Sequence, residues 1–167
     1  MKKLFTFMAL CMAVAMVVTS CKSDDEDNEK RNQEMAKTLT SIVWQGNNLY
    51  QYKEMGNWVD RGTDFVVMRF DRASETATNG TGYQLQFDGT YFNQLEEMSE
   101  FTWYFSGDDL YISYKEAGWG SVHAIIDDVT LNNSYFSGYW WTNDNDRRYR
   151  FTYQKSSFKD WDKYIKK

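Results

Sequence analysis

Apolar residues occupy every second position in short runs along most of the chain. These runs cover about residues 41–45, 48–54, 64–70, 83–88, 101–106, 110–115, 122–126, 135–142 and 147–154. Alternation with a period of two is typical of antiparallel strands that have one apolar face. Gly, Asn and Asp gather in the breaks between the runs, where they favour hairpin turns. The pattern therefore predicts an all-β domain over residues 38–167.

The expected architecture is an eight- or nine-stranded antiparallel up-and-down barrel. Closure of the sheet removes its exposed edges, so a barrel is favoured over a sandwich of two sheets, which is the second possibility. The period changes after residue 155, where Phe158, Trp161 and Ile165 fall on one helical face and Ser157 can cap it. We expect a short C-terminal helix there, packed on the outside of the sheet.

Residues 1–20 have the features of a secretion signal. Lys2 and Lys3 form a charged start, and a mostly apolar stretch over residues 4–18 is too short for a stable membrane-spanning helix. Val18-Thr19-Ser20-Cys21 resembles the lipobox of Bacteroidetes lipoproteins, in which the cysteine thiol receives a diacylglycerol. The resemblance implies that the mature chain begins at Cys21 and is anchored to a membrane by its acyl chains.

The residues after Cys21 resemble a second lipoprotein signal. Ser23, Asp24, Asp25, Glu26 and Asp27 are similar to the acidic export signal that sends lipoproteins of that phylum to the outer face of the outer membrane. The resemblance implies a lipid-anchored protein at the cell surface. The other interpretation is that the acidic run is simply a solvated stretch of charge and Cys21 an incidental thiol.

The segment 21–37 is expected to be an acidic, flexible tether. Residues 24–34 contain no apolar side chain, so the segment cannot bury enough surface to offset its ordering entropy. Glu29 to Leu39 could still form a marginal helix if Met35 and Leu39 anchor it.

Composition excludes several function classes. The 167-residue chain has a net charge of −5, so it lacks the basic face that nucleic-acid binding requires. His123 is the only histidine, and Cys11 is expected to leave with the signal peptide. Asp127-Asp128 and Glu96-Glu97 are adjacent pairs whose members point to opposite faces of a strand, unlike the paired carboxylates of a glycosidase. We expect no enzymatic activity, no metal centre and no cofactor.

Several short motifs in residues 38–155 resemble the lipocalin-like lipoproteins of Bacteroidetes. These motifs are Thr40-Ser41-Ile42-Val43-Trp44, Thr81-Gly82-Tyr83, Phe101-Thr102-Trp103, Ser106-Gly107-Asp108-Asp109-Leu110, Tyr111-Ile112-Ser113-Tyr114, Phe136-Ser137-Gly138 and Phe151-Thr152-Tyr153. The lipocalin Gly-x-Trp signature is absent, since Ile42 lies two residues before Trp44. The resemblance implies a small barrel with an apolar interior and one open end.

Aromatic residues make up 18% of the chain, and many of them are expected inside the barrel. The expected interior set is Phe101, Trp103, Phe105, Phe136, Trp140, Tyr149, Phe151 and Tyr153. They either fill a solid core or line a pocket for one small ligand. In the second case Trp103, Trp140, Tyr149 and the turn residue Trp119 are the candidate ligand contacts.

The opposite face of the strand at 135–142 carries three further aromatic residues, Tyr135, Tyr139 and Trp141. Three aromatic side chains on the solvent face of one strand suggest a cover, which is either the C-terminal helix, a partner protein or a glycan. The sequence therefore leaves two functions open. One is a surface-anchored barrel that binds a small apolar or aromatic molecule or a glycan, and the other is a solid interaction subunit that docks to another cell-envelope protein.

Overall fold

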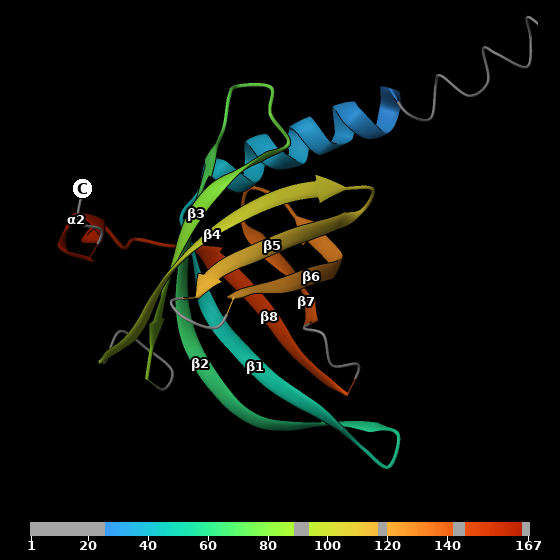
Figure 1. The fold of residues 1–167 in the computed structure, drawn as a ribbon, viewed down its shortest axis with the longest axis vertical. Helices are drawn as coiled ribbons and strands as arrows, with labels where there is room; N and C mark the ends of the chain where they lie inside the picture. The colour runs from blue at the N-terminus through green and yellow to red at the C-terminus, as the bar shows by residue number, and fades with distance from the viewer. Residues whose placement is uncertain (1–25, 89–93, 117–119, 142–145, 165–167) are drawn as a thin grey trace, which may run out of the picture.

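The protein is an eight-stranded, antiparallel, up-and-down β-barrel (Figure 1). The computed structural model describes residues 26–88, 94–116, 120–141 and 146–164. The strands are β1 (Trp44–Glu54), β2 (Asn57–Arg72), β3 (Asn79–Phe87), β4 (Leu95–Ser106), β5 (Asp109–Glu116), β6 (Gly120–Leu131), β7 (Tyr135–Trp141) and β8 (Arg147–Lys155). Each strand pairs with the next in the sequence, and β1 pairs with β8 to close the barrel.

This architecture confirms the barrel and excludes the sandwich. Of the run expected at 41–45, only residues 44 and 45 are in a strand, and they join the run at 48–54 in β1 because Gly46 continues the ladder and pairs with Tyr153. Residues 41–43 lie in the connection between the N-terminal helix and β1. A side chain could not replace the hydrogen at Gly46, since a Cβ there would lie 2.6 Å from the carbonyl oxygen of Thr152. The strands β2, β3 and β4 all extend beyond the runs in which apolar residues alternate.

One half of the barrel interior is a solid aromatic core. All eight aromatic residues expected inside belong to its cluster, seven of them buried and Tyr149 partly buried, with Trp140 and Tyr149 at its boundary with the other half. Phe136 lies at its centre, with ring centroids 4.9 Å from Phe151 and 5.7 Å from Trp44. Trp44 joins the core through its ring and donates its indole N–H to the carbonyl oxygen of Leu39 at 2.9 Å.

A helix over residues 26–40 lies across this end of the barrel and closes it (Figure 1). Ala36 and Leu39 are fully buried in the core and Met35 packs against it. Arg31 adds an ion pair with Asp108 in the turn between β4 and β5, at 2.5 Å. Residues 26–37 are therefore helical, as in the marginal helix that Met35 and Leu39 were expected to anchor, and not a flexible tether. Three apolar residues near the end of the helix give this polar segment a surface on which to dock.

The C-terminal segment covers the outer face of β2 and β3. Trp161 is buried there with Phe65, Val67, Leu85 and Phe87, and Phe158 packs against the same cluster. Packing outside the sheet agrees with the sequence prediction, but the helix α2 spans only Trp161–Tyr164. It begins later than expected, and the segment before it is irregular and tied to the chain ahead of β1 by a hydrogen bond from the N–H of residue 156 to the carbonyl oxygen of Val43. Ile165 lies outside the described residues.

The buried end of the N-terminal helix gives a first prediction. Leu39→Ala removes a fully buried side chain from the core and is expected to lower the free energy of unfolding by about 2–5 kcal/mol. The exposed neighbour Lys37 provides the control, since Lys37→Ala is expected to change stability by less than about 0.5 kcal/mol. Urea unfolding of the two variants measures the difference. Equal midpoints would show that the helix is not part of the cooperative barrel.

Candidate functional site

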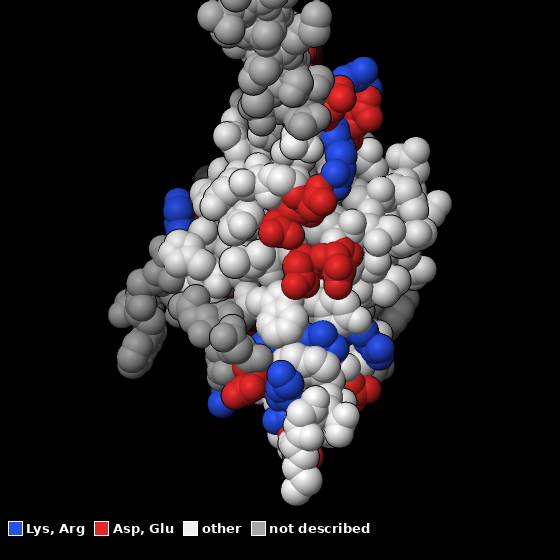
Figure 2. Space-filling model, turned by 90° about the vertical axis from the view of Figure 1, so that its right-hand side faces the viewer, with Lys and Arg blue, Asp and Glu red and all other residues white. Residues whose placement is uncertain are grey.

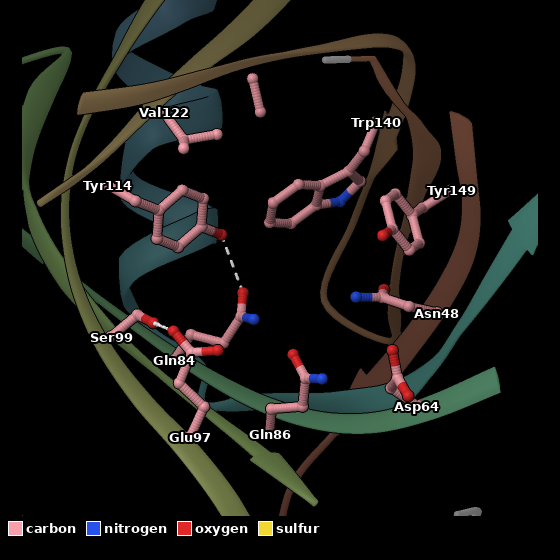
Figure 3. Close-up of a pocket in the computed structure, with 11 residues that line it drawn as sticks. Asn48, Asp64, Gln84, Gln86, Glu97, Ser99, Tyr114, Val122, Trp140 and Tyr149 are labelled. Atoms are coloured by element: carbon pink, nitrogen blue, oxygen red, sulfur yellow. Dashed lines mark hydrogen bonds between the residues drawn. The ribbon is translucent and has the colours of Figure 1, made fainter. Parts of the chain in front are cut away.

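The end of the barrel opposite the N-terminal helix holds a pocket of about 230 Å³ (Figure 3). It forms because the inward side chains change character along the strands. On β4, Phe101, Trp103 and Phe105 fill the closed half, whereas Glu97 and Ser99 face the open half. The full lining consists of Asn48, Asp64, Gln84, Gln86, Glu97, Ser99, Tyr114, Val122, Ala124, Trp140 and Tyr149.

The polar wall is built from residues paired across neighbouring strands. Asn48 on β1 pairs with Asp64 on β2. On β3 and β4, Gln86 pairs with Glu97, and Gln84 with Ser99. A cross-strand pair places both side chains on one face of the sheet, so the three pairs present amide, hydroxyl and carboxylate groups to the same space.

Hydrogen bonds hold several of these groups in place. Ser99 donates its hydroxyl proton to Glu97 Oε1 at 2.7 Å. The Tyr114 hydroxyl donates to Gln84 Oε1 at 2.8 Å, which links the polar wall to the aromatic one. Asn48 accepts a hydrogen bond from the Tyr153 hydroxyl at the boundary with the solid core. The polar wall is therefore ordered before any ligand enters.

The opposite wall is aromatic. Figure 3 shows Tyr114, Trp140 and Tyr149 facing the carboxylates and amides across the cavity. The rings of Tyr114 and Trp140 stack with centroids 5.9 Å apart and an interplanar angle of 22°. Trp140 is only 6% exposed, and its indole N–H has no hydrogen-bond acceptor among the described residues. A buried N–H donor without a partner is uncommon in folded proteins and carries a free-energy cost.

The electrostatic field of the pocket is negative. Asp64 and Glu97 are acidic, and no lysine or arginine occurs among the described residues that line the cavity. Burial raises the pKa of Asp64, and the nearby Asp88 carboxylate raises it further. Burial also raises the pKa of Tyr149, with a smaller contribution from Asp64 and an opposing one from Arg147. For Tyr114, burial raises the pKa well above its usual value, and Tyr153 and Glu97 add to the shift.

The candidate ligand contacts named from the sequence divide into three groups. Trp140 and Tyr149 both line the pocket. Trp103 does not, because it is 1% exposed within the solid half of the core and donates its indole N–H to the carbonyl oxygen of Thr81 at 2.9 Å. Trp119 lies outside the described residues.

The sequence analysis missed the polar wall because it placed the apolar face of each strand inside. On β3 the opposite holds: Leu85 and Phe87 point outward beneath the C-terminal segment, and Gln84 and Gln86 point inward. The amphipathic pattern of β3 is the same for both orientations. Phe158 and Trp161 could have revealed the orientation of β3. These two apolar side chains of the C-terminal segment need an apolar surface on the outside of the sheet on which to pack.

The outer aromatic residues of β7 do not form one open surface. Arg148 on β8 covers two of them, with its guanidinium carbon 4.2 Å from the ring centroid of Tyr139 and 5.6 Å from that of Trp141. Trp58 on β2 packs edge-on against Trp141 at 5.4 Å. Tyr135 is 41% exposed. Side chains of β2 and β8 therefore cover Tyr139 and Trp141. The sequence had suggested the C-terminal helix, a partner protein or a glycan as the cover.

The lone histidine lies on the outer face of the barrel. His123 Nδ1 is 2.8 Å from the hydroxyl oxygen of Ser113, its cross-strand neighbour. His123 is exposed, and it does not line the pocket at the open end. This pair has the geometry of an ordinary polar contact between neighbouring strands.

Acidic side chains also gather on one outer face of the molecule (Figure 2). Burial raises the pKa of Asp127, the nearby Trp141 indole opposes the shift, and Asp128 and Asp109 add to it. Within the described ranges, however, no group of three His, Cys, Asp or Glu side chains is placed to hold a metal ion.

Most residues of the N-terminal lipoprotein signals lie outside the described part of the chain, including Cys21, Ser23, Asp24 and Asp25. Glu26 and Asp27 are the first described residues of the N-terminal helix. From residue 26 onward, no described helix is both long and apolar enough to cross a membrane.

The raised pKa of Asp64 gives a second prediction. Because the folded protein binds this proton more tightly than the unfolded chain, the carboxylate lowers the free energy of unfolding once the pH exceeds its folded-state pKa. Asp64→Asn is therefore expected to raise the urea midpoint at neutral pH. This gain should shrink as the pH falls toward the ordinary Asp value of 3.8. Glu100→Gln, on the outer face of β4, should change stability by less than about 0.5 kcal/mol. A gain that does not vary with pH would contradict the argument.

Comparison with protein-family models, with curated proteins and with solved structures found no match for this chain.

Proposed function

We propose that the protein is a non-enzymatic binding protein that holds one small molecule in the open end of its barrel. The observation that carries this proposal is the cavity itself, in which a polar wall held by hydrogen bonds faces the aromatic side chains of Tyr114, Trp140 and Tyr149. The ordered polar groups opposite supply the few orienting contacts that small-molecule sites use.

The lining favours a polar ligand with one flat or apolar side. The polar wall offers carboxylate, amide and hydroxyl groups, and the aromatic wall offers rings. A wholly apolar molecule would leave the buried faces of the polar groups without partners, which costs free energy. A polar molecule of modest size can contact both walls at once. The pocket therefore supports small-molecule binding in a form more polar than that expected from the lipocalin-like resemblance.

The same proposal includes a membrane anchor at Cys21. It rests on the signal-like residues 1–20, the lipobox-like residues 18–21 and the acidic run that follows. Acylation at Cys21 would hold the barrel at the outer membrane, with cell-surface exposure following from the acidic export signal. Several acyl chains are needed for a firm anchor, because one chain alone binds a membrane only marginally.

Docking to another envelope protein receives less support. That function would use an open aromatic surface at Tyr135, Tyr139 and Trp141. Two of these three side chains are half-buried against Arg148, and Trp141 also packs against Trp58. Small-molecule binding is therefore the better-supported function.

Filling the pocket tests the proposal. Val122 lines the cavity and is half-buried, so Val122→Phe should occupy the ligand space. Ile125→Phe adds the same ring to the outer face of the same strand, where Ile125 is 41% exposed. The full chain is incubated with the small-molecule fraction of a bacterial lysate and examined by native mass spectrometry. A bound mass on the native protein and on Ile125→Phe, but not on Val122→Phe, is expected.

Urea midpoints of both Phe variants ensure that a lost adduct does not reflect unfolding. An identical adduct on folded Val122→Phe, or no adduct on the native protein, would count against small-molecule binding in this pocket.

The anchor is tested separately by fatty-acid labelling in a bacterium that expresses the full chain. Cys21→Ser is expected to abolish incorporation of an alkyne-tagged fatty acid, since it removes the acceptor thiol. Cys11→Ser removes the other cysteine of the chain, which lies inside the signal-like segment, and should leave labelling unchanged. Undiminished labelling of Cys21→Ser would exclude Cys21 as the attachment site.

A further inference from the structure

We infer that the ligand of the barrel pocket is a small organic cation, in the class of alkyl ammonium compounds. This inference rests on the proposed function and names the chemistry of its ligand. Two features of the pocket carry it: the sign of its charged groups and the composition of its aromatic wall.

The charged groups of the lining are all negative. Asp64 and Glu97 come from different strands, β2 and β4, and both contribute to the polar wall. No described lining residue supplies a compensating positive charge. Burial is the main cause of the raised pKa values of Asp64 and Tyr149, and negative charge adds to both, from Asp88 at Asp64 and from Asp64 at Tyr149, while Arg147 opposes the shift at Tyr149. A cation in the pocket would relieve the repulsion, whereas an anion would increase it.

The aromatic wall suits a cation as well. Trp140, Tyr114 and Tyr149 lie on one side of the cavity, with the carboxylates opposite (Figure 3). Aromatic faces attract ammonium groups through their quadrupole, most strongly when the site is sheltered from water, and aromatic cages recognise quaternary ammonium ligands. A cation between the two walls would contact a ring on one side and a carboxylate on the other.

The volume limits the size of the ligand. A cavity of about 230 Å³ corresponds to about eight water molecules at their volume in liquid water. A molecule with the dimensions of choline can enter it, whereas the closed aromatic half of the barrel leaves no room for a long acyl chain.

Three probes separate the contributions. Choline carries the cation and the hydroxyl group, tetramethylammonium carries only the cation, and 3,3-dimethyl-1-butanol has the shape of choline without its charge. Isothermal titration of the full chain with each probe is the experiment. Choline is expected to bind about tenfold or more tightly than 3,3-dimethyl-1-butanol, since only the cation gains from the rings and carboxylates.

Two substitutions assign the contacts. Asp64→Asn should weaken choline and tetramethylammonium alike, by about tenfold, because each loses one charged partner. Tyr149→Leu removes one ring of the aromatic wall, so it should weaken choline and tetramethylammonium alike, by about fivefold, and leave 3,3-dimethyl-1-butanol nearly unchanged. Glu100→Gln changes the net charge by the same amount on the outer face of β4 and should affect neither probe. Asp64→Asn is expected to be at least as stable as the native protein, so a loss of binding would not reflect unfolding.

Equal binding of choline and 3,3-dimethyl-1-butanol would overturn the cationic class, and so would binding of D-glucose in place of both ammonium probes. The same holds if neither ammonium probe binds at millimolar concentration. The proposed function has its own test, because a bound mass lost only in Val122→Phe would still show a small-molecule site of different chemistry.

Discussion

Closure of β1 against β8 is the constraint on which the rest of the structure depends. Once the sheet is closed, each side chain of a strand lies either inside or outside, and the inside has a fixed and limited volume. Aromatic rings from β4, β7 and β8 use that volume at one end, where they pack edge to face. The other end is left to shorter polar side chains and three rings, and so it keeps a cavity.

The helix over residues 26–40 completes this asymmetry. It buries Ala36 and Leu39 against the aromatic core and so removes one of the two openings of the barrel. A barrel with two open ends would expose the ring cluster to water at the end that the helix now covers. At the other opening Asp64 is half-buried, and burial raises the pKa of its carboxyl group. The same partial burial that destabilises a carboxylate strengthens its attraction for an oppositely charged ligand, a common compromise between stability and function.

Periodicity predicted the strands well, because alternation is a local property that a barrel preserves. It predicted the interior rings for the same reason, since Phe136 and Phe151 face inward in any closed arrangement of these strands. It could not decide the orientation of β3, where both faces are covered, and so Gln84 and Gln86 were missed. It could not separate Trp103 from Trp140, because the two differ only in their height along the barrel axis, which depends on strand register. The N-terminal helix was foreseen only as marginal, since its docking surface is made by distant strands.

The position of the N-terminal helix also bears on how the barrel would sit at a membrane. The described part of the helix that seals the closed end starts at residue 26, and the proposed attachment residue Cys21 precedes it by five positions. Five residues can span at most about 18 Å. A barrel tethered so briefly would stand close to the lipid surface on its sealed side. Strands β1 to β8 would then hold the mouth of the pocket on the side away from the bilayer, where solutes arrive from the surrounding medium without crossing the headgroup layer.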